Sequence, residues 1–259
     1  MKVISLGWGV QSFGLAALSA LGILPRVDAA IHADTGHERS ETYEFAKKWT
    51  PWLEEHGVRV VTVKAKIAPY NFTASSIFVA AYSSGGNKAN GQLKRECTER
   101  WKIAPIRRWL QANRGKEQVE QWIGISFDEL ERMKPSDVKY IVNTFPYLNL
   151  PDNFFPRVMR RSDIVRWLQE NDLEVPVKSA CVMCPYHDRA TWREIQLSGN
   201  GDWQKALAVD EAIRHKRPGY TCYLTPKRKP LAECDFRSQE EHGQLTMWDA
   251  EECSGMCFL

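Results

Sequence analysis

The sequence lacks several features that would place it at once in other classes of protein. No apolar run among its 259 residues approaches the roughly 20 residues that span a bilayer. Met1 leads directly into a strand-like run at residues 3–5, without the basic segment and apolar core of a secretion signal. The net charge is only +3, which is too small to indicate a nucleic-acid partner by itself. We therefore expect a cytoplasmic protein that does not bind membranes.

Cysteine, by contrast, is abundant. The chain has seven, an odd number without a secretion signal, so a disulfide framework is not expected. Metal binding or redox chemistry is the better interpretation of these thiols. The cysteines are Cys97, Cys181, Cys184, Cys222, Cys234, Cys253 and Cys257.

Strands and helices alternate over the first 63 residues, which predicts a parallel, right-handed βαβαβ sheet. The expected strands cover 2–5, 27–33, 58–63 and 119–125, and the expected helices 11–21, 40–56, 103–112 and 162–171. The predicted fold class is α/β, with a doubly wound, mostly parallel sheet. We expect this domain to occupy residues 1–195, and a smaller, irregular, cysteine-containing extension to occupy 196–259.

A glycine-rich turn follows the first predicted strand and leads into the first predicted helix. Gly7 and Gly9 would let the backbone approach an anion closely, and the start of the helix supplies N–H groups and the positive end of its dipole. Ser5, Gln11 and Ser12 add polar side chains. The turn has neither the lysine of a Walker A loop nor the GxGxxG of dinucleotide folds. It is either a phosphate-binding loop or a tight connection between strand and helix.

Polar residues also end two other predicted strands. Asp34, Thr35 and Gly36 follow the second strand, and Gly124 lies near the end of the fourth. Ligands of open α/β sheets bind along this carboxyl edge, so these residues are candidates for nucleotide contact. The alternative is an ordinary strand-end turn with a solvated helix behind it.

The cysteines suggest a metal centre. Cys181 and Cys184 have the Cys-x2-Cys spacing that holds one metal, but the pair needs another soft ligand, for which Cys97 is the obvious candidate. Cys253 and Cys257, on a glycine-containing tail, could supply a further ligand or an attacking thiolate. Incidental buried or surface thiols are the alternative in each case.

Taken together and in this order, these segments resemble the phosphoadenylyl sulfate (PAPS) reductase family of the PP-loop ATP pyrophosphatases, which have the adenine nucleotide α-hydrolase-like fold. The resemblance covers about residues 1–195 and is most specific at Asp34-Thr35-Gly36 with the stretch 41–45. Further matches are the loop 5–12, Cys97 with Lys102 and Pro105, Gly124 with Glu129 and Arg132, and the helix 163–168. The chain departs from the family at Ser126, where the family has arginine, and in its Cys-x3-Cys tail.

The resemblance implies an adenine nucleotide, either ATP or APS/PAPS, as the bound ligand, and Mg²⁺ could accompany ATP. Our first hypothesis is ATP-dependent thiolation, in which adenylation of an acceptor releases pyrophosphate and a sulfur donor then supplies sulfur. A 4Fe–4S cluster on Cys97, Cys181 and Cys184 would carry that sulfur, with Cys257 as a possible fourth ligand. The acceptor could be nucleic acid, bound by the basic segment 214–229, which is otherwise a solvated loop.

Two alternatives remain open. In a sulfonucleotide reductase, a thiolate of Cys253 or Cys257 would attack the sulfur of APS or PAPS, and a thioredoxin-like partner would restore it. In a non-enzymatic module, Cys97, Cys181, Cys184 and one of the other four cysteines would hold structural zinc, and the domain would bind nucleotide or nucleic acid. Oligomeric state is not indicated by the sequence.

Overall fold

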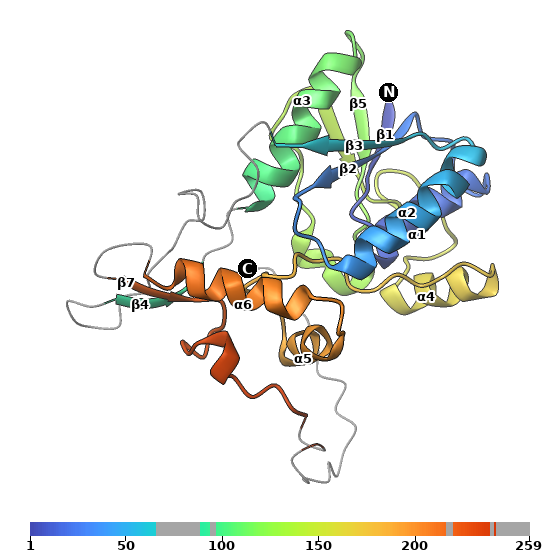
Figure 1. Cartoon of the computed structure of the whole chain (residues 1–259). Coiled ribbons are helices and arrows are strands. Elements are labelled where there is room, and N and C mark those ends of the chain that lie inside the picture. Colours follow the sequence, from blue (N-terminus) through green and yellow to red (C-terminus); the bar gives the residue numbers. More distant parts are fainter. Residues whose placement is uncertain (66–88, 94–96, 216–219, 239–240, 242–259) are drawn as a thin grey trace. The chain divides into compact units, whose positions relative to one another are not determined.

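The computed structural model describes residues 1–65, 89–93, 97–215, 220–238 and 241 of the chain (Figure 1). The chain divides into two compact units. The first comprises residues 1–66 and 99–179, and the second comprises 67–98 and 180–259. The expected division after residue 195 therefore falls inside the second unit.

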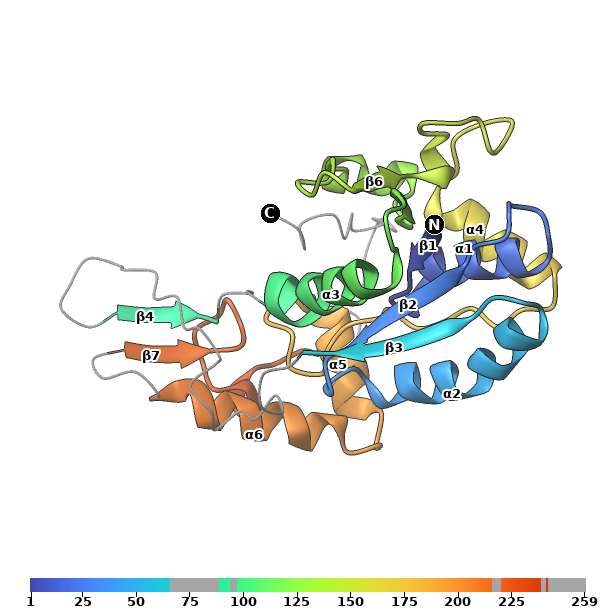
Figure 2. The ribbon, with the colours of Figure 1, turned by 90° about the horizontal axis from the view of Figure 1, so that it is seen from above.

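The first unit is built on a five-stranded sheet whose neighbouring strands are all parallel (Figure 2). Its strands are β1 (Lys2–Ser5), β2 (Ala29–Asp34), β3 (Val60–Lys64), β5 (Val119–Trp122) and β6 (Ile141–Thr144). They lie in the order β3-β2-β1-β5-β6. This sheet confirms the predicted α/β class with a mostly parallel sheet.

Helices cover both faces of this sheet because both faces of its central strands are apolar. Ile4 packs with residues of α1 (Val10–Ala20), α2 (Ser40–Glu55) and α4 (Arg161–Glu170). Its neighbour Val3 points to the other face and packs with residues of α3 (Ala104–Asn113). Successive strand residues thus enter different cores, as the two-residue period of a strand requires. Short helical segments also occur between these elements in the chain: η1 (Thr98–Ile103), η2 (Phe127–Arg132) and η3 (Pro146–Leu148).

Gly14 interrupts the helical pattern of α1, and the packing explains why. A Cβ at this position would lie 2.6 Å from Oη of Tyr147 and 2.8 Å from Cγ2 of Ile164. Both of those side chains are fully buried. The residue that lowers helix propensity is therefore the one that allows α1 to approach α4 closely.

The second unit contains regular elements that the sequence pattern did not predict. Strands β4 (Ala89–Gln92) and β7 (Tyr220–Tyr223) pair in parallel, and α5 (Arg189–Leu197), α6 (Asp202–Arg214) and η4 (Leu231–Glu233) surround a separate core. Helix α6 escapes prediction because its buried face carries Asp202 and Asp210, each 1% exposed. Asp210 accepts hydrogen bonds from the backbone N–H groups of Leu224 at 3.0 Å and Leu231 at 2.8 Å. These bonds hold the segment after β7 against α6.

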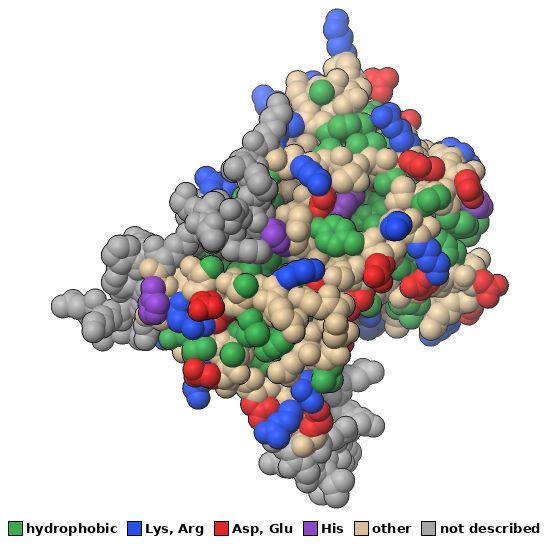
Figure 3. All heavy atoms as spheres, in the orientation of Figure 1, with side chains coloured by type: hydrophobic (Ala, Val, Ile, Leu, Met, Phe, Trp, Pro, Cys, Tyr) green, Lys and Arg blue, Asp and Glu red, His purple; other side chains and the backbone are tan. Residues whose placement is uncertain are grey.

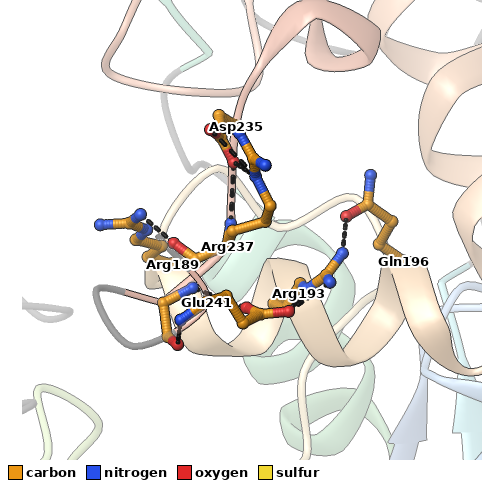
Figure 4. A network of polar contacts seen from close by, with 7 residues as sticks. Arg189, Arg193, Gln196, Asp235, Arg237 and Glu241 are labelled. Carbon is orange, nitrogen blue, oxygen red and sulfur yellow. Dashed lines mark hydrogen bonds and ion pairs between the residues drawn. The ribbon is translucent and has the colours of Figure 1, made fainter. Parts of the chain in front are cut away.

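Polar contacts join Arg237 and Glu241, which come after η4 in the chain, to helix α5 (Figure 4). Arg193 donates from Nε to Oε1 of Glu241 at 3.1 Å. Arg189 donates to the backbone carbonyl of Arg237, whose own guanidinium is paired with Asp235 at 2.8 Å. Two arginines on one side of α5 thus hold Arg237 and Glu241 in place.

The described helices are all too short or too polar to cross a membrane. On the face shown in Figure 3, basic and acidic side chains are interspersed over the described residues. This distribution agrees with the small net charge of +3.

Candidate functional site

The candidate site lies in the first unit, where the order of the strands reverses. From β1, the chain adds β2 and β3 on one side, whereas β5 and β6 lie on the other. Ligands of open parallel sheets bind outside the carboxyl ends of the strands at such a reversal point. Because β1 is parallel to both β2 and β5, the segments that follow these three strands meet at this edge. The structure therefore brings together the predicted segments 5–12, 34–36 and 124.

The loop between β1 and α1 has a well-defined shape. Ser5 is the last residue of β1. The N–H of Gly7 donates to Oγ of Ser12 at 3.0 Å, and this hydroxyl donates to the carbonyl of Gly9 at 3.3 Å. Between the glycines, Trp8 has a φ of 58°, a left-handed conformation that is unusual for a bulky residue. Its ring is buried against that of Phe13, which compensates for the strained backbone.

The first turn of α1 itself carries no negatively charged side chain. Gly9 is the N-cap and offers no side-chain acceptor, and the first turn contains no acidic residue. By contrast, α2, α4 and α6 carry Glu41, Asp163 and Asp202 in their first turns. An anion bound at α1 would gain both the dipole and the backbone N–H groups of the first turn.

Three residues outside the loop hold it in position. The hydroxyl of Ser179 donates to the carbonyl of Gly7, and the buried Tyr147 donates from its hydroxyl to the carbonyl of Gln11 at 2.9 Å. Burial raises the pKa of Tyr147 well above its ordinary value, so the donor keeps its proton. A Cβ on Gly124 would lie 2.9 Å from the backbone nitrogen of Ser12, so only glycine fits there without a shift. Gly124 was predicted for this site, whereas Ser179 and Tyr147 were not.

The turn after β2 is organised by Asp34. Its Oδ1 accepts hydrogen bonds from the N–H of Gly36 at 2.7 Å and the hydroxyl of Tyr43 at 2.8 Å. Lys64 lies 3.0 Å from its Oδ2. Burial alone would raise the pKa of Asp34, but these donors outweigh it and lower the pKa below the ordinary value. Gly36 has a φ of 77°, which explains the glycine of this turn.

The same turn also holds a buried carboxylate beside a lysine. Glu38 is 1% exposed, and its Oε1 lies 3.0 Å from Nζ of Lys102, which is 35% exposed. The hydroxyl of Thr35 donates to the same oxygen at 3.2 Å. Thr35 and Lys102 were predicted from the sequence to belong to the site, but Glu38 was not. The only sequence feature that could have indicated Glu38 is the position of its acidic side chain just after the end of a strand.

A third carboxylate joins η2 to the first turn of α1. Oε2 of Glu129 accepts a hydrogen bond from Nε2 of Gln11 at 3.1 Å. The same oxygen lies 2.7 Å from Nη1 of Arg132. The Gln11 amide, predicted to contact nucleotide, is therefore oriented by Glu129 at this edge of the sheet.

His32 stabilises the end of β1 from inside the sheet. Burial lowers its pKa, so the imidazole is neutral near pH 7. Its Nδ1 lies 3.1 Å from the carbonyl of Leu6, and because a carbonyl can only accept, Nδ1 carries the proton. This role of His32 was not predicted from the sequence.

The cysteines predicted to bind metal, Cys97, Cys181 and Cys184, belong to the second unit. Cys181 and Cys184 lie in a tight turn, in which the N–H of Cys184 donates to the carbonyl of Cys181 at 3.0 Å. His187, three residues on, has its Nε2 at 2.8 Å from the same carbonyl. Within the described part of the chain, no group of three or more His, Cys, Asp or Glu side chains is arranged to hold a metal ion. Cys253 and Cys257 lie outside the described residues, and the metal centre stays a prediction.

Two other cysteines belong to the core of the second unit. Cys222 is 1% exposed, and burial together with the nearby charge of Asp210 raises its pKa to about 12. The sulfur of Cys234 lies 3.6 Å from Oγ1 of Thr225, which is also buried. A thiol with the pKa of Cys222 is protonated at neutral pH and is a poor thiolate ligand.

Comparison with known proteins adds little. No family model matches the chain, and no curated protein matches its sequence. Twelve chains of solved structure match its fold. One is the phosphoadenylyl-sulfate (PAPS) reductase from Candida auris in a phosphate complex. It is 12% identical, with a TM-score of 0.46, over 68% of this chain and 74% of the reductase.

Proposed function

We propose that this chain is an ATP-dependent adenylating enzyme of the PP-loop type, which activates an acceptor and releases pyrophosphate. The observation that carries the proposal is the N-terminus of α1, which follows a glycine-containing loop at the reversal point of the sheet and has no acidic residue in its first turn. This is the arrangement that phosphate groups bind in parallel α/β folds.

In the proposed reaction the phosphates of ATP lie against the loop at residues 7–12, and the adenosine lies near residues 32–36. An oxygen of the acceptor attacks the α-phosphorus and forms a new P–O bond. The bond from that phosphorus to the bridging oxygen breaks, and pyrophosphate leaves with its electron pair. Lys102, held by Glu38, supplies positive charge to the departing phosphates. ATP commonly enters such sites with Mg²⁺, which would share this neutralisation.

The sulfur-transfer step is a separate part of the proposal. A 4Fe–4S cluster or zinc ion would need Cys97, Cys181 and Cys184 to converge, and the described residues do not by themselves form such a ligand set. Metal analysis of cysteine variants tests whether these thiols are ligands.

Product analysis tests the adenylation. Purified protein is incubated with ATP, with and without tRNA, single-stranded DNA or small-molecule acceptors, and pyrophosphate release is measured. We expect ATP binding by calorimetry and acceptor-dependent release of pyrophosphate. Binding of APS or PAPS with release of sulfite, and no pyrophosphate from ATP, would instead identify a sulfonucleotide reductase. Binding of no adenine nucleotide would refute both enzymatic hypotheses.

A further inference from the structure

An exposed aromatic ring with a guanidinium over it lies where β5 leads into η2. Phe127 follows Ser126 directly, and its side chain is 41% exposed. The guanidinium carbon of Arg160 lies 5.2 Å from the centre of its ring. An aromatic side chain this exposed contributes little to the core and leaves part of its ring accessible to solvent.

Backbone contacts place this pair rigidly. The N–H of Phe127 donates to the carbonyl of Met159 at 2.9 Å. Asp128 accepts hydrogen bonds from the N–H of Arg161 at 2.6 Å and from the hydroxyl of Ser126 at 3.3 Å. These hydrogen bonds join the start of η2 to the segment before α4, which places the backbones of Phe127 and Arg160 near each other.

Charges of both signs lie near Phe127 in the chain: Asp128, Glu129 and Glu131 follow it, and Oδ1 of Asp128 lies 3.8 Å from Nη1 of Arg160. The arginines gather in a second segment. Residues 157–166 contain four arginines and a single acid, Asp163. Arg157 and Arg166 pair with Asp163, whose side chain is 12% exposed, and Arg160 pairs with Asp128, whose side chain is 37% exposed. The side chains of Arg157, Arg160 and Arg166 are themselves 66%, 60% and 65% exposed. Arg161 is also exposed, and its guanidinium makes no ion pair with any residue that the structure describes. Solvent thus meets mainly the cations of this segment.

The same surface borders the phosphate loop. Glu129, two residues beyond Phe127, accepts the hydrogen bond from Gln11 in the first turn of α1. A molecule stacked on Phe127 would therefore lie next to the loop where the proposed function places the phosphates of ATP. An acceptor that attacks ATP must bind beside it.

We propose that Phe127 and Arg160 form a stacking platform for an unpaired base of a single-stranded nucleic-acid acceptor, whose phosphates contact Arg157, Arg161 and Arg166. Single-stranded nucleic acids are bound by aromatic rings on which bases stack, within a positively charged surface that follows the backbone. This inference rests on the proposed function, because it names the acceptor that would be adenylated. It assigns the nucleic-acid surface to the first unit, and not to the basic segment 214–229.

The test measures binding of a fluorescent single-stranded oligonucleotide of about 12 nucleotides, as DNA and as RNA, by anisotropy over a range of salt concentrations. The variants Phe127→Ala, Phe127→Tyr and Arg161→Ala are compared with the wild-type full chain. Leu21→Ala and Arg108→Ala are matched controls, because Leu21 is 40% exposed and Arg108 is an exposed arginine on α3. ATP affinity is measured on the same samples by calorimetry.

We expect Phe127→Ala to bind the oligonucleotide about fivefold to 100-fold more weakly, while Phe127→Tyr keeps the wild-type affinity. Arg161→Ala should lower the dependence of log affinity on log salt by about 0.7. Equal affinities of Phe127→Ala and Leu21→Ala would overturn the platform, as would a wild-type chain that binds anionic vesicles but neither oligonucleotide. ATP binding that persists in those cases would leave the proposed adenylation intact, whereas oligonucleotide binding without ATP binding would refute the adenylation alone.

Discussion

Nζ of Lys102 lies 3.0 Å from Oε1 of Glu38, whose side chain is 1% exposed. The lysine comes from η1 and the glutamate from the turn after β2, so this ion pair joins two segments at the carboxyl edge of the sheet. Burial removes water from the Glu38 carboxylate, so this carboxylate depends on Lys102 as a partner. It therefore restricts the position of the ammonium far more than an exposed carboxylate would. The ion pair therefore fixes the position of the Lys102 ammonium.

Replacing Lys102 with methionine should lower both stability and turnover. The substitution keeps the length of the side chain but removes the ammonium beside Glu38, and we expect a loss of about 1–3 kcal/mol in the free energy of unfolding. Urea denaturation and pyrophosphate release measure the two effects. Lys116→Met, at an exposed lysine, is the control. Unchanged stability and unchanged turnover in Lys102→Met would contradict the assigned role.

Two substitutions of Gly9 separate charge from steric effects. Gly9 has an extended backbone with a φ of −92°, and an added Cβ would make an ordinary contact with Ser179 at 3.4 Å. Gly9→Ala should therefore fold and bind ATP with a modest loss. Gly9→Asp adds negative charge beside the phosphates and should weaken ATP binding by about tenfold or more, measured by calorimetry. Equal ATP affinities of the two variants would argue against phosphates at this loop.

The lowered pKa of Asp163 predicts that the stability of the fold depends on pH. Hydrogen bonds from Arg157, and then from the N–H of Arg160, lower the pKa of Asp163 from 3.8 to about 2. Because the pKa is lower in the folded than in the unfolded chain, the stabilisation is complete above pH 3.8 and is lost as the pH falls towards 2. Asp163→Asn should cost about 1 kcal/mol at neutral pH, as expected for a carboxylate at the N3 position of a capping box.

The measurement for Asp163 is urea unfolding of wild type and variant at a series of pH values. The difference between the two should shrink as the pH falls from 3.8 towards 2. Asp152→Asn, at an exposed carboxylate, should show no such convergence. A constant difference at all pH values would mean that the charge of Asp163 is not the source of the effect.

The proposed metal centre predicts which cysteine variants lose their metal. Single replacement of Cys97, Cys181 or Cys184 by alanine should reduce the metal that copurifies with the chain under anaerobic conditions, since each thiolate is expected to be a ligand. Cys222→Ala should keep its metal, because the high pKa of this buried thiol disfavours coordination. Elemental analysis distinguishes iron from zinc. Full metal content in all three variants would disprove the centre.

Truncation after Asp249 tests the tail cysteines, Cys253 and Cys257. We expect the truncated chain to lose turnover, because one of these thiols is predicted to act as a ligand or a nucleophile. Loss of metal together with turnover would identify a ligand, and loss of turnover alone would identify a nucleophile. A truncated chain with full metal content and full turnover would show that the tail has no catalytic role.

The sequence alone determined the α/β class, the parallel strands and the loop at residues 7–12. These features follow from local patterns. Apolar strand residues such as Val3 and Ile4 serve both faces of the sheet, and glycine permits the tight turn after β1. Parallel strands then place the ends of β1, β2 and β5 at one edge, so Asp34 and Gly124 could be placed at that edge from the sequence.

Only the tertiary structure decided which side chains support that edge. Gln11 and Glu129 are 118 positions apart, and Gly7 and Ser179 are 172 positions apart. No local periodicity connects such pairs, because a hydrogen bond depends on where the folded chain returns and not on sequence spacing. Helix α6 was missed for a related reason. In the sequence, Asp210 is typical of an exposed helix face. In the structure it is buried and accepts hydrogen bonds from the N–H groups of Leu224 and Leu231.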